Sequence, residues 1–129
     1  MRIVTEKQII DTVSRLLSDI NFVLSDDVTK KLEDAVKRET SPLAGDVLTK
    51  LQDNLLCARE NRIPVCQDTG MAVIFMEIGQ EVHFTDGNLE EAINEGVRQG
   101  YIEGFLRKSV VSDPLIRENT KDNTPAVIH

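Results

Sequence analysis

The sequence has little cysteine, little basic charge and no long apolar run, and each shortage excludes a class of protein. Its two cysteines, Cys57 and Cys66, are too few for a disulfide framework. Its 15 basic residues are outnumbered by 22 acidic ones, for a net charge of -7, which argues against a nucleic-acid-binding surface. The longest unbroken apolar run covers only residues 71–76, whereas a membrane-spanning helix needs roughly 20 residues.

The N-terminus lacks the apolar block of a signal peptide, so we expect a cytoplasmic protein with reduced cysteines. With 129 residues, 40% of them hydrophobic, the chain is long enough to bury one core. Acidic charge is concentrated in residues 77–103, whereas residues 104–129 carry a small basic excess. An anionic substrate is therefore expected in the last quarter of the chain, or beside a partner chain. The basic residues there are Arg107, Lys108, Arg117 and Lys121.

The first 60 residues predict three amphipathic helices in succession. Apolar residues recur at three- and four-residue spacing in all three segments. We interpret these stripes as ordinary core, and Cys57, beside the third stripe, as a packing residue. The N-terminal signals are the capping-box pair Thr5 and Gln8, then Ser25 or Asp26, then Ser41 followed by Pro42 at the first helical position.

After Asn61 the pattern changes to strands, turns and one further helix. Pro64 ends the helical periodicity, residues 71–78 form a β-like run, and residues 82–84 predict a short pairing strand. A fourth helix is expected over residues 89–101, weakened by two glycines. Residues 108–124 are expected to form a loop. Residues 125–129 have the pattern of a strand that is just beginning.

These patterns predict an α+β fold. A helical leader over residues 1–62 precedes a small mixed β-sheet with packed helices over residues 63–129. Because natural domains rarely stop as an apolar strand begins, we expect a truncated part of a larger domain. The alternative is a short C-terminal edge strand.

Residues 64–70, Pro-Val-Cys-Gln-Asp-Thr-Gly, place a thiol, an amide, a carboxylate and a hydroxyl on a turn between a helix and a strand. Loops held by rigid elements often carry binding groups. Cys66 is therefore a candidate ligand, with a small core residue as the alternative. Zinc is disfavoured because no Cys-x-x-Cys or His-x-x-x-His pair exists. An iron–sulfur cluster needs three or four thiolates, so its other ligands would lie outside residues 1–129.

Arg107 follows the apolar end of the fourth predicted helix. A guanidinium group binds carboxylates bidentately, which suits a di-acid substrate. The alternative is a cation that stabilises the helix C-terminus, and residue types alone favour that alternative. The Asn, Asp and Thr residues over 119–124 are those typical of turns.

Together, residues 64–70 and residues 106–126 resemble the iron–sulfur (class I) fumarate hydratases, most closely their α subunit or α region. The L(+)-tartrate dehydratase α subunit is a close relative within that group. The resemblance covers essentially the whole chain. It implies part of a hydro-lyase of the tricarboxylic acid cycle that reversibly hydrates fumarate to L-malate. It also implies a β subunit or β region as partner, and we expect the assembly to be a homo-oligomer.

The resemblance further implies a [4Fe–4S] cluster held by three cysteines, with an open iron that acts as a Lewis acid. On this pattern Cys66 is the first ligand, and the other two lie outside residues 1–129. Gln67 and Asp68 would contact the substrate, with Asp68 as the catalytic residue at the hydroxyl or the departing water. Arg107 would clamp a substrate carboxylate. The proton-abstracting base is expected on the partner region, outside residues 1–129. Residues 1–129 alone are therefore expected to be inactive.

Other functions remain as alternatives. Dehydration of L(+)-tartrate uses another four-carbon di-acid, and nothing in the two motifs separates it from fumarate hydration. A non-catalytic helical binding module would keep Cys66 in its core and use the three helices as an interaction surface. A thiol-dependent enzyme is disfavoured because the only histidines available as a base are His83 and the terminal His129.

Overall fold

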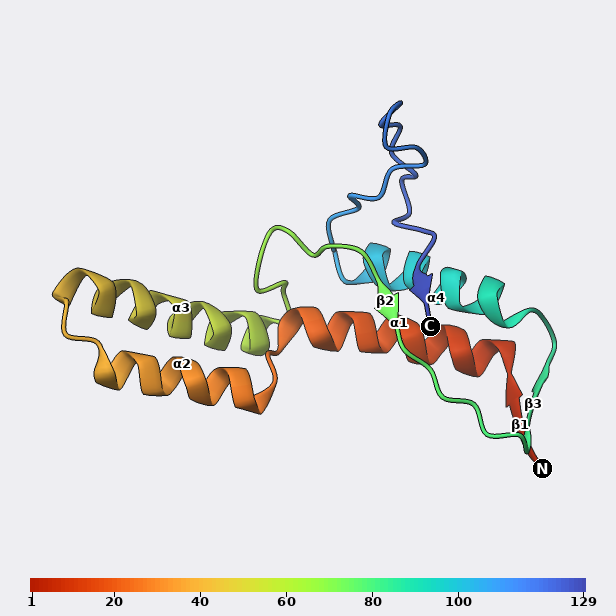
Figure 1. The fold of residues 1–129 in the computed structure, drawn as a ribbon, viewed down its shortest axis with the longest axis horizontal. Helices are drawn as coiled ribbons and strands as arrows, with labels where there is room; N and C mark the ends of the chain where they lie inside the picture. The colour runs from red at the N-terminus through yellow and green to blue at the C-terminus, as the bar shows by residue number, and fades with distance from the viewer. The chain divides into compact units, whose positions relative to one another are not determined.

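A computed structural model describes residues 1–129, which form four helices and four short strands (Figure 1). None of the helices combines the length and the apolar character that a membrane span needs. The contacts divide the chain into two units, Met1–Ser18 with Gln67–His129, and Asp19–Cys66. In chain order the elements are β1 (Arg2–Thr5), α1 (Glu6–Phe22), α2 (Asp26–Arg38), α3 (Pro42–Asn61), β2 (Val73–Ile74), β3 (Val82–Thr85), α4 (Leu89–Glu103) and β4 (Val127–Ile128).

Helix α1 begins at the predicted capping box. The backbone N–H of Gln8 donates to Thr5 Oγ1 at 3.3 Å, and the backbone N–H of Thr5 donates to Gln8 Oε1 at 3.0 Å. These two bonds satisfy donors that the first helical turn would otherwise leave unpaired. Within the first unit, the face of α1 that carries Val13 and Leu17 is buried.

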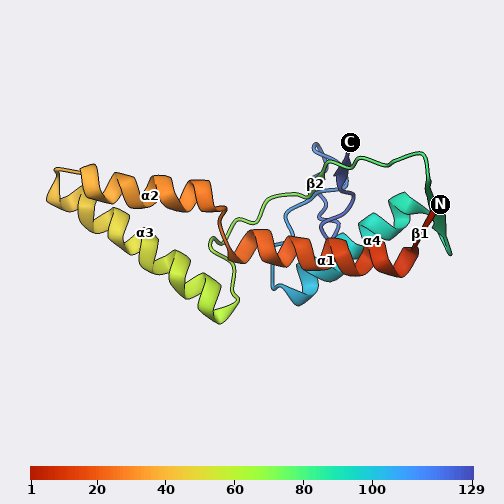
Figure 2. The ribbon, with the colours of Figure 1, turned by 90° about the horizontal axis from the view of Figure 1, so that it is seen from below.

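Helix α4 lies beside α1, as both ribbon views show (Figure 2). Asn88 caps it, because its side-chain oxygen accepts hydrogen bonds from two backbone N–H groups of the first turn. The two glycines that lower the helix propensity of α4 have a role in packing. A Cβ on Gly96 would lie 2.7 Å from Val13 Cβ, and one on Gly100 would lie 3.1 Å from the Ser14 backbone. The two glycines therefore allow the helices to approach closely.

Replacing Gly96 with Ala is expected to destabilise the protein. The added methyl group overpacks the contact with Val13, which costs about 1–3 kcal/mol of stability. The better helix propensity of alanine returns at most about 1 kcal/mol, so the net effect is a loss. Chemical denaturation of the full-length protein measures the change. Gly45→Ala in α3 is the matched control, since a Cβ there meets nothing within 4 Å. A Gly96→Ala variant as stable as its parent would contradict the close contact.

The strands form two parallel pairs. β1 pairs with β3, in the register Arg2 with Val82 through Thr5 with Thr85. β2 pairs with β4, in the register Val73 with Val127 and Ile74 with Ile128. Both pairs join segments far apart in the chain, so their registers depend on the packing of the intervening elements.

The predicted α+β fold class is confirmed. The β content differs in detail from the prediction, because it forms two small parallel pairs instead of one mixed sheet. The strand at residues 82–84 is confirmed as β3, but its partner is β1 at the N-terminus. The strand expected within residues 125–129 is confirmed as β4.

The second unit contains the helical hairpin of α2 and α3. Both helices occur where the sequence predicts them, and Pro42 occupies the first turn of α3. The interpretation of their apolar stripes as core is wrong for these residues. No residue of α2 is buried, and in α3 only Ala58 is. Leu43, Val47 and Leu51 of α3 are exposed, because a two-helix hairpin offers too little partner surface to cover both stripes.

Candidate substrate site

The residues just before Cys66 contact α1 and α3 within the second unit. Helix α3 ends at Arg62, whose left-handed conformation (φ 51°) turns the chain away from the helix. The Arg62 guanidinium lies 5.5 Å from the centre of the Phe22 ring and 3.7 Å from the Asp19 carboxylate. Asn54 then donates from its side-chain amide to the Val65 carbonyl at 2.9 Å. Side chains of α1 and α3 thus hold the chain just before Cys66.

Both cysteines are exposed. The interpretation of Cys57 as a packing residue is therefore wrong, since it lies on an open face of α3 near the Asn61 amide. Exposure also removes the alternative that made Cys66 a core residue. An exposed thiol on a loop has the accessibility that a metal ligand or a reactive cysteine requires.

Gln67 and Asp68 begin the first unit's second segment, and both are exposed. Asp68 Oδ1 accepts a hydrogen bond from the Gly70 backbone N–H at 3.2 Å, which closes a tight turn. Gly70 has a left-handed backbone (φ 63°), a conformation that glycine adopts without steric cost. The turn leaves one oxygen of the Asp68 carboxylate available to another partner.

The Thr69 hydroxyl connects this turn to Arg107. It accepts a hydrogen bond from the Arg107 backbone N–H at 2.9 Å and donates to the Arg107 carbonyl at 3.2 Å. Arg107 lies beyond the end of α4, after the left-handed Phe105 (φ 53°), and its side chain is exposed. The structure therefore brings the two sequence motifs together at Thr69 and Arg107, with the Asp68 side chain one residue from the contact.

Two buried side chains donate hydrogen bonds to the backbone of the turn. The Tyr101 hydroxyl donates to the carbonyls of Thr69 at 3.2 Å and Gly70 at 3.0 Å. Asn123, with no exposed surface, donates from its amide to the Gly70 carbonyl at 3.1 Å. Burial raises the pKa of Tyr101, and the nearby Asp68 carboxylate adds to that rise, although the Asn123 hydrogen bond opposes it. Tyr101 therefore remains a neutral hydrogen-bond donor at physiological pH.

Asn123 also connects the turn to the segment after Arg107. Its side-chain oxygen accepts from the backbone N–H groups of Ser109 at 2.7 Å and Val110 at 3.0 Å. The segment over residues 108–124, expected to be loop, is held by side-chain bonds to its backbone and by an antiparallel bridge between Val111 and Asn119. Its basic residues Arg117 and Lys121 are exposed, and Lys108 is half-buried.

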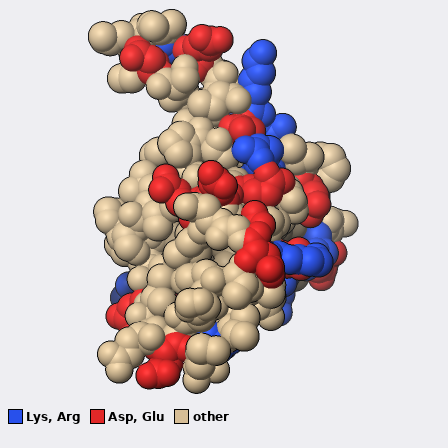
Figure 3. All heavy atoms as spheres, turned by 90° about the vertical axis from the view of Figure 1, so that its right-hand side faces the viewer, with Lys and Arg blue, Asp and Glu red and all other residues tan.

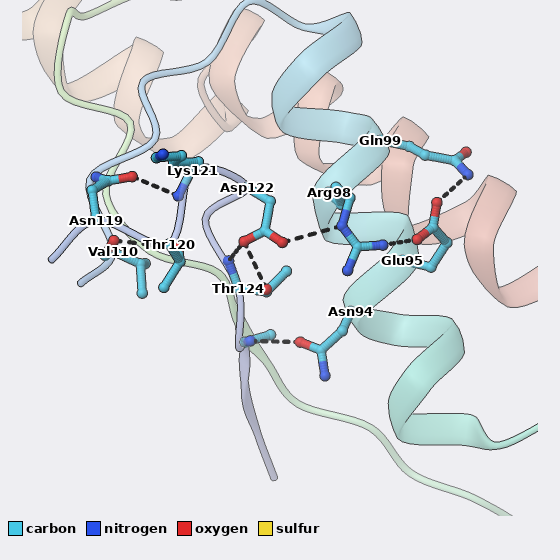
Figure 4. A network of polar contacts seen from close by, with 11 residues as sticks. Asn94, Glu95, Arg98, Gln99, Val110, Asn119, Thr120, Lys121, Asp122 and Thr124 are labelled. Carbon is cyan, nitrogen blue, oxygen red and sulfur yellow. Dashed lines mark hydrogen bonds and ion pairs between the residues drawn. The ribbon is translucent and has the colours of Figure 1, made fainter. Parts of the chain in front are cut away.

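A polar network fixes the chain beyond Asn123 to α4 (Figure 4). Arg98 of α4 donates to Asp122 at 3.1 Å and also pairs with Glu95. Burial by itself would raise the pKa of Asp122, but hydrogen bonds from the Thr124 backbone and hydroxyl and from Arg98 lower it below its ordinary value. Asn94 then accepts from the Ala126 backbone N–H at 2.8 Å, next to β4. The network therefore holds Asn123 in place from its C-terminal side.

Acidic side chains gather on one face of the molecule. Asp and Glu side chains form a broad group on the face drawn in Figure 3, with fewer Lys and Arg beside it. Glu90 and Glu91 lie in the first turn of α4, where negative charge is favourable to the helix dipole. Such a surface disfavours the approach of a dianionic ligand to that face.

Of the predicted site residues, Gln67, Asp68 and Arg107 lie in the unit in which Thr69 bonds to the Arg107 backbone. Cys66 is the last residue of the other unit and is joined to Gln67 by the chain. Thr69, Tyr101 and Asn123 were not predicted as site residues. Tyr101 is the only tyrosine of the chain, and its place on the apolar stripe of α4 gave no sign of a polar contact. Asn123 lies in a run of Asn, Asp and Thr residues that is typical of turns.

The donor groups present fit one ligand of an iron–sulfur cluster. Cys66 supplies an exposed thiol with polar neighbours, which is chemically suited to iron. No group of three or more His, Cys, Asp and Glu side chains in this chain could hold a metal ion. A cluster needs three or four thiolates, so residues 1–129 fit one ligand of the set and cannot hold a cluster alone.

Comparison with known proteins identifies relatives for nearly the whole chain. The family described as fumarate hydratase (Fumerase) matches residues 10–129. A protein of Methanocaldococcus jannaschii named "Putative L(+)-tartrate dehydratase subunit alpha" is 37% identical over 90% of this chain and 41% of its own length. The L(+)-tartrate dehydratase subunit alpha of Escherichia coli O157:H7 is 26% identical over 92% of this chain and 40% of its own length.

The anaerobic class I fumarate hydratase of Escherichia coli K12 is 42% identical over 55% of this chain and 13% of its own length. The chain thus spans about two fifths of the length of the tartrate dehydratase subunits that it matches.

Proposed function

The chain belongs to the fumarate hydratase (Fumerase) family, and we propose that it forms the N-terminal part of the α subunit or α region of a hydro-lyase. The complete protein would add water to fumarate to give L-malate and catalyse the reverse reaction. Residues 1–62 would be a helical leader, and residues 63–129 would carry the substrate-binding groups. The observation that carries the proposal is the pair of hydrogen bonds between the Thr69 hydroxyl and the Arg107 backbone. These bonds join the segment that carries the Gln67 amide and the Asp68 carboxylate to the segment that carries the Arg107 guanidinium.

Each of these groups suits one part of a four-carbon hydroxy di-acid. The exposed Arg107 guanidinium binds one substrate carboxylate in a bidentate manner. The Gln67 amide hydrogen-bonds to the other carboxylate or to the hydroxyl. Asp68, whose second oxygen is not used by the turn, holds the hydroxyl or the departing water. As catalytic residue, it is the group on this chain that contacts the reacting oxygen.

Cys66 would be one thiolate ligand of a [4Fe–4S] cluster whose remaining ligands lie outside residues 1–129. When bound, such a cluster supplies an open iron that acts as a Lewis acid on the substrate hydroxyl. The residues of this chain bind and orient the di-acid next to that ligand. A β subunit or region would complete the site and contribute the base, in a cytoplasmic, homo-oligomeric assembly.

Dehydration of L(+)-tartrate is a second candidate, favoured by one specific observation. The two relatives described above that match nine tenths of this chain are named as tartrate dehydratase alpha subunits, whereas the fumarate hydratase described above matches 55% of it. L-Malate and L(+)-tartrate are both four-carbon di-acids with a hydroxyl beside a carboxylate. The same Gln67, Asp68 and Arg107 groups would therefore serve either one.

The test is turnover by the complete α chain with its β partner, after anaerobic reconstitution with iron and sulfide. Fumarate hydration and L(+)-tartrate dehydration are measured on the same preparation. Turnover of fumarate supports the first proposal, and turnover of tartrate alone replaces it with the second. A reconstituted assembly that binds iron but turns over neither di-acid would contradict both.

Replacing Arg107 with Lys is expected to raise KM for the di-acid by about 10- to 150-fold, the value of a charge-assisted hydrogen-bond pair. Lysine keeps the positive charge but loses the bidentate fork, so the expected change is in binding more than in kcat. Lys108→Arg is the matched control, because Lys108 is the adjacent cation. Steady-state kinetics with the reconstituted assembly measure both constants. An unchanged KM would remove Arg107 from the substrate site.

A further inference from the structure

Thr69 makes an unusual contact for a single hydroxyl, because it bonds to both backbone groups of one residue 38 positions away. Arg107 lies in an irregular segment after α4, where no helix or strand pairing fixes its backbone. Its N–H and its carbonyl both go to the Thr69 hydroxyl. The hydroxyl therefore determines where the backbone of Arg107 lies relative to the turn over residues 67–70.

The turn itself cannot easily shift to compensate. Its Gly70 carbonyl is held by two buried donors, the Tyr101 hydroxyl and the Asn123 amide. The Asn123 side chain also bonds to the backbone of Ser109 and Val110, just beyond Arg107. Because the surrounding contacts are buried and satisfied, loss of the Thr69 hydroxyl would free mainly the Arg107 segment.

We propose that Thr69 is a positioning residue that sets the separation between the Gln67–Asp68 pair and the Arg107 guanidinium, and thereby the length of di-acid that the site accepts. This inference rests on the proposed function, in which these groups bind opposite ends of one substrate. A fixed separation between two carboxylate-binding groups discriminates between di-acids that differ by one methylene. The hydroxyl acts through Arg107 and does not itself touch the substrate.

The test compares Thr69→Val, which keeps the shape but removes the hydroxyl, with Thr69→Ser, which keeps the hydroxyl. Both variants are made in the complete reconstituted assembly. The first readout is hydrogen exchange of the segment over residues 106–108, measured without substrate. We expect faster exchange at the Arg107 amide in Thr69→Val, and exchange like that of the parent in Thr69→Ser.

The second readout is the inhibition constant of succinate relative to that of glutarate, which is one methylene longer. In the parent protein succinate should bind more tightly. Thr69→Val should reduce that preference about three- to tenfold, the effect of one hydrogen bond, and Thr69→Ser should restore it. A general loss of stability would weaken both inhibitors equally and leave the ratio unchanged.

The outcomes separate this inference from the proposed function. A parent assembly that binds neither succinate nor glutarate rejects the di-acid site and the positioning role together. A parent that prefers succinate, with the same ratio in Thr69→Val, rejects only the positioning role. Unchanged exchange at the Arg107 amide in Thr69→Val also overturns it. Should that variant fail to assemble, Thr69→Ala removes the same hydroxyl, and rescue by Thr69→Ser remains the deciding comparison.

Discussion

Asp68→Asn in the reconstituted assembly is expected to lower kcat by about 10²- to 10⁴-fold, the usual contribution of a group that handles a proton in the reaction. The substitution separates two roles of this side chain. Asparagine retains the oxygen that accepts from the Gly70 N–H, so the turn should survive. It loses the negative charge and the ability to accept a proton from the attacking water in hydration and to return it to the departing hydroxyl in dehydration. The expected change is therefore in kcat, with a smaller change in KM.

Two measurements control this result. The free energy of unfolding should differ from that of the parent by less than about 0.5 kcal/mol, as for a surface substitution that leaves its hydrogen bond in place. Asp46→Asn, at an exposed carboxylate of α3, should leave kcat unchanged. A variant Asp68→Asn with parental kcat would restrict Asp68 to its turn. A variant that lost stability and kcat together would show that the turn needs the charge.

Cys66→Ser is expected to abolish iron retention and turnover while leaving the fold intact. Serine cannot replace a thiolate as an iron ligand at neutral pH. The side chain is exposed, so its replacement creates no cavity and should leave the helix content unchanged. Bound iron and acid-labile sulfide per α chain are measured after anaerobic reconstitution, with circular dichroism on the same samples.

The chain provides its own control for this experiment. Cys57 is also an exposed free thiol, but it lies on α3 away from residues 64–70 in sequence. Cys57→Ser should retain parental iron and turnover, which excludes a general effect of losing a thiol. If Cys66→Ser held as much iron as Cys57→Ser, Cys66 would not be a ligand.

The predictable parts of the fold are those decided by neighbouring residues. The capping box of Thr5 and Gln8 and the proline at the start of α3 act within one helical turn, and both occur as predicted. Apolar periodicity located the helices for the same reason. Periodicity does not say what covers an apolar stripe, however. The sequence predicts the stripes of α2 and α3 to be core, but in these residues only Ala58 is buried and the others are half-buried or exposed.

The parts that the sequence could not predict are contacts between distant segments. Residues 82–84 have the composition of a strand, but nothing local selects β1 as their partner. The hydrogen bonds of Thr69 to Arg107 and of Asn123 to Gly70 span 38 and 53 residues. Motif resemblance pointed to Gln67, Asp68 and Arg107, the groups with direct chemistry. It did not point to Thr69, Tyr101 and Asn123, whose residue types occur in many unrelated settings.

The most direct test of this account is hydrogen exchange of the complete reconstituted assembly with and without an equilibrated mixture of fumarate and L-malate. The central claim is that the Gln67–Asp68 pair and Arg107 bind the same di-acid. The account predicts that residues 66–70 and residues 106–108 gain protection together, at the same substrate concentration. Protection of only one segment, or of neither while the assembly turns over substrate, would contradict it.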